Sequence, residues 1–366
     1  MRVLLAERVV GPGALALGLA ACSGPAPAPP GPRLEATFTE AYRIDAFAAV
    51  STLRFAPNDQ LVVLDRMDKE LVVLGPEGDE RARWRPTPDR SAPAPAALAV
   101  SADGRVALNS PAGRINTFTL DGEHLETYGE DGRAVFGLAF DGAEHILVDA
   151  RSSSIQALME GSARQVTRWP EGNVVWTSEP MAPPTGAPRP FRAFPLFAHL
   201  GPGAIAVGMT DEYDLSILDG AGAPVGRLTR DVRLRGPDNR FKDYWTGLMR
   251  DGGEPEDGIE QIVWPSTFPA IGYVFSGPPD GTIWVRRRLG VDDEHSAPVQ
   301  VMLQSVFRVY DLFDPDTYGY LGTVEAPENV RLMDGNDDSV AGRFMGAFDE
   351  GPVIVYRVEL PELGGN

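Results

Sequence analysis

Residues 50–84, "VSTLRFAPNDQLVVLDRMDKELVVLGPEGDERARW", decide the fold of this 366-residue chain. Short apolar runs alternate here with turns rich in Gly, Asp, Asn and Pro, and no helical periodicity is present. Apolar runs bounded by such turns predict β-strands. The run Leu61–Leu64 is apolar at every position. It therefore predicts a strand that is buried on both of its faces.

The same phrase recurs along the chain with a period of about 40 residues. Further copies begin near Ala96, Val135, Phe194, Ile271 and Asn329. Several short strands repeated at this period are typical of β-propeller blades, each buried between two neighbours. The sequence therefore predicts an all-β, six-bladed β-propeller over residues 34–361, followed by a C-terminal tail at 362–366.

The ends of the chain predict how the ring closes. The last copy supplies three strands, near residues 330–334, 339–345 and 352–358, and the chain then ends. Residues 36–44, "ATFTEAYRI", have strand composition but precede the first copy. We expect this N-terminal strand to pair beside the final strand and complete the C-terminal blade, which leaves no open edge.

Three phrases carry a family resemblance: "SADGRVALNS" (101–110), "PPDGTIWVRRR" (278–288) and "VYDLFDPDTYGYLGTV" (309–324). With them the chain resembles bacterial six-bladed β-propeller lipoproteins related to the NHL-repeat and TolB-like propeller group. The resemblance covers about residues 35–361 and implies an architecture rather than a reaction.

The N-terminal sequence predicts where in the cell the protein is located. Arg2 and Arg8 flank a start that turns apolar over Val9–Leu19, the layout of a secretory signal peptide over residues 1–21. The run Leu19–Cys22 resembles the bacterial lipobox, which implies a lipid on Cys22. The alternative is a buried structural cysteine. Residues 22–33 then form the lipidated cysteine and a Pro-rich linker. We expect an extracytoplasmic protein, lipid-anchored to the cell membrane or the outer membrane of a bacterial envelope.

Composition and motifs exclude several functions. The net charge of -19 argues against binding to nucleic acid, which needs a basic surface. The four histidines, His124, His145, His199 and His295, are scattered without metal-ligand spacing. The expected starts of the inner strands are mainly apolar, which disfavours an axial calcium ion. The sequence predicts no catalytic residue, no metal site and no cofactor.

Two long connections, 170–193 and 236–268, are candidate binding loops. They fall between blades, on the face that also carries the loops joining each blade's second and third strands. Trp245 lies in the second connection and is a candidate ligand-binding residue. The alternatives are that the connections are tolerated insertions or a small covering helix, and that the tryptophans clamp them to the scaffold.

A ring of polar side chains is expected on the same face, at the ends of the second strands. Its members are Asp65, Arg66, Asn109, Asp149, Arg151, Asp211, Arg286 and Arg287. Arginine forks suit carboxylates, so Arg286 and Arg287 are candidates to capture an acidic peptide tail or a sugar acid. The alternative pairs these arginines with Asp292, Asp293 and Glu294.

Together these patterns favour a membrane-anchored extracytoplasmic propeller that binds a protein partner or a small extracellular ligand without catalysis. The alternative is a metal-dependent propeller hydrolase or lyase acting on a small substrate.

Overall fold

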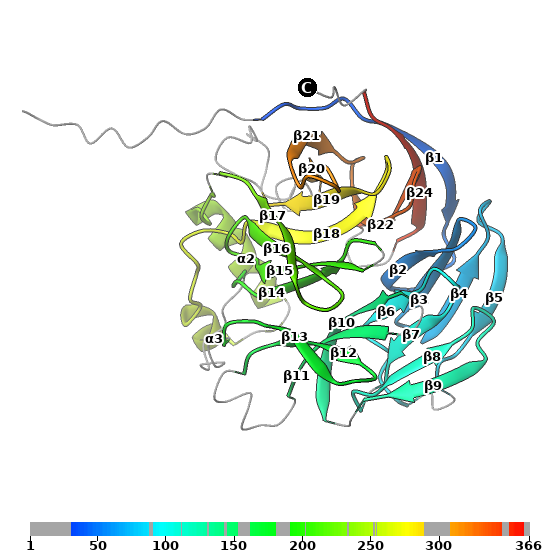
Figure 1. Ribbon diagram of the computed structural model, residues 1–366. Coiled ribbons are helices and arrows are strands. Elements are labelled where there is room, and N and C mark those ends of the chain that lie inside the picture. The colour runs from blue at the N-terminus through cyan, green and yellow to red at the C-terminus, as the bar shows by residue number, and fades with distance from the viewer. Residues whose placement is uncertain are drawn as a thin grey trace, which may run out of the picture.

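The computed structural model describes residues 31–361 except 88–90, 111, 130–131, 143–144, 153–161, 181–190, 202, 233, 252, 254, 289–307 and 346–350. The predicted signal peptide and Cys22, the predicted site of lipidation, lie outside the described residues. The strands form six four-stranded antiparallel sheets arranged in a ring (Figure 1). The predicted six-bladed β-propeller is confirmed.

The first three blades follow one another along the chain. Blade 1 contains β2 (Val50–Ala56), β3 (Gln60–Asp65), β4 (Glu70–Leu74) and β5 (Glu80–Trp84). Blade 2 contains β6 (Leu98–Val100), β7 (Val106–Asn109), β8 (Ile115–Phe118) and β9 (His124–Tyr128). Blade 3 contains β10 (Arg133–Asp141), β11 (His145–Ser152), β12 (Gln165–Trp169) and β13 (Asn173–Thr177).

The last three blades complete the ring. Blade 4 contains β14 (Pro195–His199), β15 (Ala204–Met209), β16 (Asp214–Asp219) and β17 (Pro224–Thr229). Blade 5 contains β18 (Ile271–Gly277), β19 (Thr282–Arg287), β20 (Val309–Phe313) and β21 (Tyr320–Glu325). Blade 6 contains β22 (Val330–Gly335), β23 (Ser339–Phe344), β24 (Val353–Glu359) and β1 (Thr37–Ile44). The first strands of neighbouring blades contact one another all the way around, so they surround the axis.

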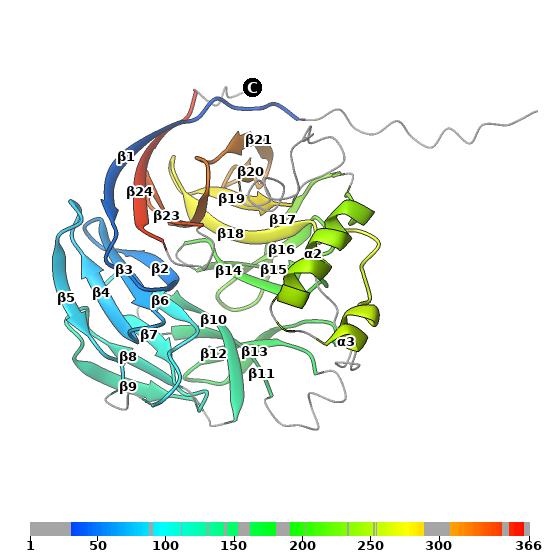
Figure 2. The ribbon, with the colours of Figure 1, turned by 180° about the vertical axis from the view of Figure 1, so that it is seen from behind.

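The ring closes as the sequence predicts. β1 pairs antiparallel with β24 from Thr37 opposite Glu359 to Ile44 opposite Val353. In both ribbon views the blue strand runs alongside the red one (Figures 1 and 2). Blade 6 therefore contains strands from both ends of the chain.

Stacking of blades explains the apolar run in β3. Leu61 and Val63 pack in one buried cluster with Val353 of blade 6, whereas Val62 and Leu64 pack in another cluster with residues of blade 2. Alternate side chains of a strand point to opposite faces, so each face of the blade 1 sheet meets a different neighbour. Burying both faces removes their apolar surface from water, the main stabilising contribution to such a ring.

The topology gives the propeller two ends. We call the end that carries the inter-blade connections and the turns between second and third strands, such as residues 45–49 and 66–69, the loop face. The end that carries the turns between first and second strands is the opposite face. The long connection after β17 contains α2 (Asn239–Asp251) and α3 (Glu256–Glu260), which lie at one side of the ring (Figure 2).

One expected connection is shorter than predicted. Residues 173–177 form β13, the outer strand of blade 3, so only the segment from 178 to 194 joins blades 3 and 4. The sequence "NVVWT" forms a strand because it pairs with β12, a contact that the flanking Pro and Gly residues conceal. Among the described helices, neither α2 nor α3 has the length and apolar character needed to cross a bilayer.

Candidate functional site

The inner strands enclose a cavity on the propeller axis, which we call the axial cavity. Its volume is about 180 Å³, and residues at or just before the inner strands of all six blades line it. The polar lining residues are Ser51, Thr52, Arg54, His199, Tyr273 and Arg331. None of the described residues that line this cavity is acidic.

Tyr273 gathers positive charge on one side of the axial cavity. The guanidinium carbons of Arg286 and Arg331 lie 5.8 and 5.9 Å from the centre of its ring. The Arg54 guanidinium donates a 3.0 Å hydrogen bond to the Tyr273 hydroxyl. A cation within about 6 Å of an aromatic ring is attracted to its face. One tyrosine of blade 5 therefore holds three arginines from blades 1, 5 and 6.

These positive charges are close enough to affect one another. Burial and the neighbouring Arg331 lower the pKa of Arg286 to about 9. The same two causes lower the pKa of Arg288. Burial and a nearby like charge both disfavour the charged form of a base. A negatively charged ligand beside Arg286, Arg288 and Arg331 would offset both effects.

A glycine makes room for Arg286. The Arg286 Nη2 donates to the carbonyl of Gly272 at 3.0 Å. A Cβ atom on residue 272 would lie 2.8 Å from Arg286 Nε, closer than such atoms approach. β18 also has a register irregularity between Ile271 and Tyr273, next to this contact. The irregular start of β18 therefore brings the Arg286 side chain beside Tyr273.

One carboxylate near the axial cavity is already engaged. Asp334 lies 3.7 Å from the Arg54 guanidinium, and its Oδ2 accepts a 2.7 Å hydrogen bond from the backbone N–H of Phe55. Burial raises the pKa of Asp334 to about 6, although Arg54 acts in the other direction. At neutral pH Asp334 is mainly ionised and balances Arg54.

The opposite wall of the axial cavity is aromatic. Phe136 lines the cavity from blade 3 and keeps 43% of its surface exposed. Arg164 and Arg151 stack on this ring, with guanidinium carbons 4.4 and 5.2 Å from its centre. Arg164 is held by an ion pair with the buried Asp149. Two residues of the predicted polar ring, Asp149 and Arg151, therefore support Phe136.

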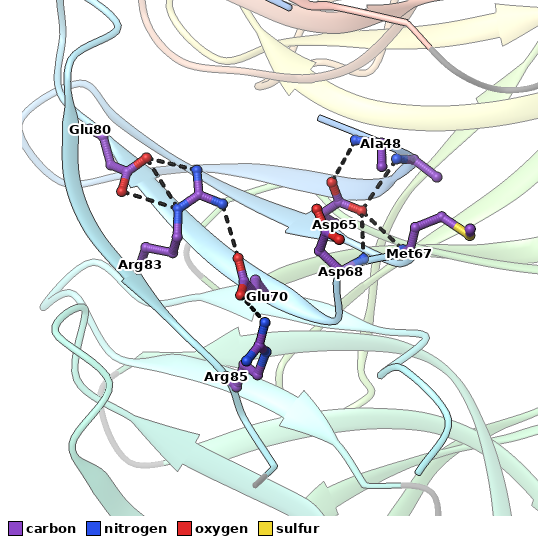
Figure 3. A network of polar contacts seen from close by, with 9 residues as sticks. Ala48, Asp65, Met67, Asp68, Glu70, Glu80, Arg83 and Arg85 are labelled. Carbon is purple, nitrogen blue, oxygen red and sulfur yellow. Dashed lines mark hydrogen bonds and ion pairs between the residues drawn. The ribbon is translucent and has the colours of Figure 1, made fainter. Parts of the chain in front are cut away.

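Two other members of the predicted ring bind their own backbone. The buried carboxylate of Asp65 accepts hydrogen bonds from the N–H groups of Ala48, Ala49, Met67 and Asp68 (Figure 3). In blade 2, Asn109 Oδ1 accepts from the N–H groups of Ala96 and Ala97, both at 2.8 Å. At each position the side chain fastens the incoming inter-blade connection to the second strand. Arg66, beside Asp65, is exposed.

Arg287 belongs to a buried ion network and points away from the axial cavity. Its Nε lies 3.1 Å from Oδ2 of Asp311. Asp311 also pairs with Arg230 and accepts hydrogen bonds from Tyr213 at 2.8 Å and Thr323 at 2.6 Å. The network joins blades 4 and 5. The partners expected from the sequence, Asp292, Asp293 and Glu294, lie outside the described residues.

Trp245 packs within the long connection. Its ring centre lies 5.0 Å from that of Phe191, which also contacts Phe241 and Phe268. This geometry matches the alternative in which the tryptophan clamps α2 to the scaffold. Asp211 is exposed and lines a separate pocket of about 320 Å³ on the loop face, together with Phe191, Arg192 and Trp264.

The residues of the predicted polar ring therefore lie in different parts of the structure. Arg286 lies beside Tyr273, which lines the axial cavity, and Asp149 and Arg151 support Phe136 in its wall. The remaining members lie elsewhere. The cavity residues Arg54, Tyr273 and Arg331 were not singled out from the sequence. A usable signal was present for two of them: each arginine interrupts an apolar inner strand, in "STLRFA" and "NVRLMD". A charged residue on an apolar inner strand is a candidate to line the axis, because the neighbouring blades cover the two faces of the sheet.

No group of three or more His, Cys, Asp or Glu side chains within the described ranges is placed to hold a metal ion.

The strand topology places the chain in the β-propeller class. No model of a known protein family matches it, and no curated protein matches its sequence. The WD40 repeats of RRP9 give a TM-score of 0.49 at 12% identity, over 89% of this chain and 100% of that one. Virginiamycin B lyase from Staphylococcus aureus gives 0.46 at 10%, over 88% and 99%. The Cps50 (Swd1) propeller domain of Myceliophteria thermophila gives 0.43 at 9%, over 88% and 100%. This likeness concerns the fold alone.

Proposed function

We propose that the protein is a non-catalytic binding propeller that holds a carboxylate group of its ligand in the axial cavity. The observation that carries this proposal is the position of Arg286 and Arg331 beside the ring of Tyr273, where Tyr273 and Arg331 line the axial cavity and no described lining residue is acidic. The whole chain carries a net charge of -19, so this local positive charge runs against the composition.

The side chains around the cavity favour a ligand with a carboxylate group. A guanidinium group offers a planar fork of donors that matches the two oxygens of a carboxylate. Apolar side chains also line the cavity, among them Leu98, Phe136, Leu138 and Phe197. Polar groups that converge on a cavity fix the orientation of a bound ligand. Exclusion of water by the apolar wall strengthens the attraction between arginine and anion.

The N-terminal pattern supports a location for this binding. We propose that the chain is exported, lipidated on Cys22 and held at a bacterial envelope membrane by residues 22–33. Incorporation of radiolabelled palmitate into the wild-type chain, but not into Cys22→Ser, is the expected result. Equal labelling of both chains would contradict the anchor and leave the proposal for the axial cavity intact.

Benzoate is a suitable first probe of the binding function, because it joins one carboxylate to a compact apolar ring. We expect benzoate to raise the unfolding temperature of the full-length chain, since a ligand at about 100 times its Kd stabilises the folded state by about 2.7 kcal/mol. Arg331→Gln should weaken binding at least about tenfold, because a hydrogen bond to a charged group is worth about 1.5–3 kcal/mol.

Arg227→Gln is the matched control, because Arg227 lies on the outer strand β17 with 65% of its side chain exposed. This variant should bind benzoate like the wild type. Equal weakening by both substitutions, or no binding of benzoate, succinate or glucuronate to the wild type, would refute the assignment of the axial cavity. Inorganic phosphate that binds more tightly than all three carboxylates would refute the ligand class.

A further inference from the structure

A second cavity lies on the side of the opposite face, among the inner strands of blades 1 to 4. Its volume is about 310 Å³, and we call it the apolar pocket. It is lined by Phe55, Ala56, Pro57, Val100, Ser101, Ala102, Phe140, Gly142 and His199. These residues lie at or just after the ends of inner strands, whereas the axial cavity is lined mainly nearer their starts.

The two cavities are consecutive along the same strands. On β6, Leu98 lines the axial cavity and Val100 lines the apolar pocket. On β10, Leu138 lines the axial cavity and Phe140 lines the apolar pocket. Side chains two positions apart point to the same side of a strand and are separated by about 7 Å along it. The apolar pocket therefore continues the axial cavity toward the opposite face.

His199 stands where the two cavities meet, because it lines both. Its Nε2 is buried and makes no hydrogen bond with any residue in the described part of the chain. Burial and the positive charge of Arg54 lower the pKa of His199 to about 4. The imidazole is therefore neutral at physiological pH.

The two cavities differ in chemistry. The axial cavity has arginine donors beside Tyr273, and the apolar pocket is lined chiefly by aliphatic and aromatic side chains. Together the two volumes approach 500 Å³, which is within the range of about 300–1,000 Å³ that is typical of small-molecule sites. A ligand that fits both ends has one anionic group and one apolar chain.

We infer that the two cavities join at His199 to form one channel that binds a medium-chain alkyl carboxylate, with its carboxylate at Arg331 and its chain passing His199 into the apolar pocket. The position of the carboxylate rests on the proposed function, and the position of the chain does not. Each methylene that leaves water contributes about 0.8 kcal/mol, or about a fourfold gain in affinity.

The test is a series of straight-chain carboxylates titrated calorimetrically into the full-length chain in detergent-free buffer. Affinity should rise from butyrate through hexanoate to octanoate by about fourfold per methylene. Octylamine carries the same chain with a positive head group and should not bind. Octyl phosphate keeps the chain and the negative charge, and it should bind more weakly than octanoate.

A variant that fills the apolar pocket provides the second test. Ala102 is exposed in the turn after β6 and lines the pocket, so Ala102→Trp fills it from the rim without altering a buried strand. This variant should bind butyrate like the wild type and lose the gain for octanoate. Ala221→Trp, the same substitution in an exposed turn between the outer strands β16 and β17, is the control. It should keep the full dependence on chain length.

The outcomes separate the two proposals. If benzoate and butyrate bind in an Arg331-dependent manner but affinity does not depend on chain length, the inference is wrong and the proposed function stands. If octylamine binds as tightly as octanoate, or if no carboxylate binds, the assignment of the carboxylate to the arginines is wrong and both fail. An unchanged gain for octanoate in Ala102→Trp would place the chain outside the apolar pocket.

Discussion

Replacing Asp65 tests whether this carboxylate is a structural fastener of blade 1. Its Oδ1 accepts hydrogen bonds from Ala49, Met67 and Asp68 at 3.2, 2.9 and 3.3 Å, and its Oδ2 accepts one from Ala48 at 2.8 Å. The residue is 1% exposed. In Asp65→Ala, four backbone N–H groups lose their acceptor. A buried donor without a partner costs about 1–3 kcal/mol.

The magnitude follows from the two short bonds. Bonds to a charged acceptor contribute about 1.5–3 kcal/mol each, and the two longer bonds contribute less because of their length. We expect Asp65→Ala to lower the free energy of unfolding by about 4 kcal/mol, a large part of a typical total of about 5–15 kcal/mol. Asp65→Asn keeps an acceptor for three of the four donors and should cost about half as much. Asn109 holds the equivalent connection in blade 2 with one amide oxygen.

The assay is urea denaturation followed by tryptophan fluorescence, with Asp68→Ala as the control. Asp68 lies in the same turn but its side chain is exposed, so its removal should change the free energy of unfolding by less than about 0.5 kcal/mol. The reasoning is refuted if Asp65→Ala costs less than about 1 kcal/mol. It is also refuted if Asp65→Asn is as costly as Asp65→Ala, since charge and not acceptor number would then be decisive.

Three further substitutions test other parts of the structure. Asp311→Asn removes the shared partner of Arg287 and should cost about 3–5 kcal/mol in urea denaturation, as does loss of one member of a buried ion pair; a cost below about 1 kcal/mol would contradict the network. His199 has a folded-state pKa of about 4 against its usual 6.5, so the unfolded chain takes up its proton first and wild-type stability falls as pH drops from 6.5 to about 4, by up to about 3 kcal/mol. The same scan on His199→Asn should lack this component, and identical slopes for the two chains would exclude His199 as its source. Gly272→Ala should displace Arg286 and weaken benzoate binding about tenfold, whereas unchanged calorimetric affinity would remove Arg286 from the binding site.

The architecture was readable from the sequence because its signals are local. An apolar run such as Leu61–Leu64, with turn residues on either side, requires only its own composition to predict a strand buried on both faces. The closing strand was readable for a related reason: the last copy lacked one strand and residues 36–44 supplied one. β13 was missed because its five residues lie between Pro- and Gly-containing segments, and pairing with β12 decides its conformation.

The candidate site was less readable because its partners are distant in sequence. Asp65 and Asn109 were expected at the loop face, where they lie. The N–H groups that donate to them belong to the preceding inter-blade connection, whose path the sequence does not indicate. Arg287 meets Asp311, which no local pattern marks as its partner. Arg331 approaches Tyr273 only because blades 5 and 6 are neighbours in the ring. The positions of these residues in the sequence therefore predicted the face of the propeller on which they lie, but not the residues that they contact.

The pairing of β1 with β24 also governs how the protein can be made. β1 is the first strand of the fold to be synthesised and β24 is the last, with Thr37 opposite Glu359. Blades 1 to 5 join strands that follow one another directly, so each can pair as soon as its own segment is complete. Blade 6 must wait, because contacts between the chain ends form late and leave strand edges exposed until then. A truncation that removes β1 or β24 opens the ring. The exposed strand edge can then pair with a second chain.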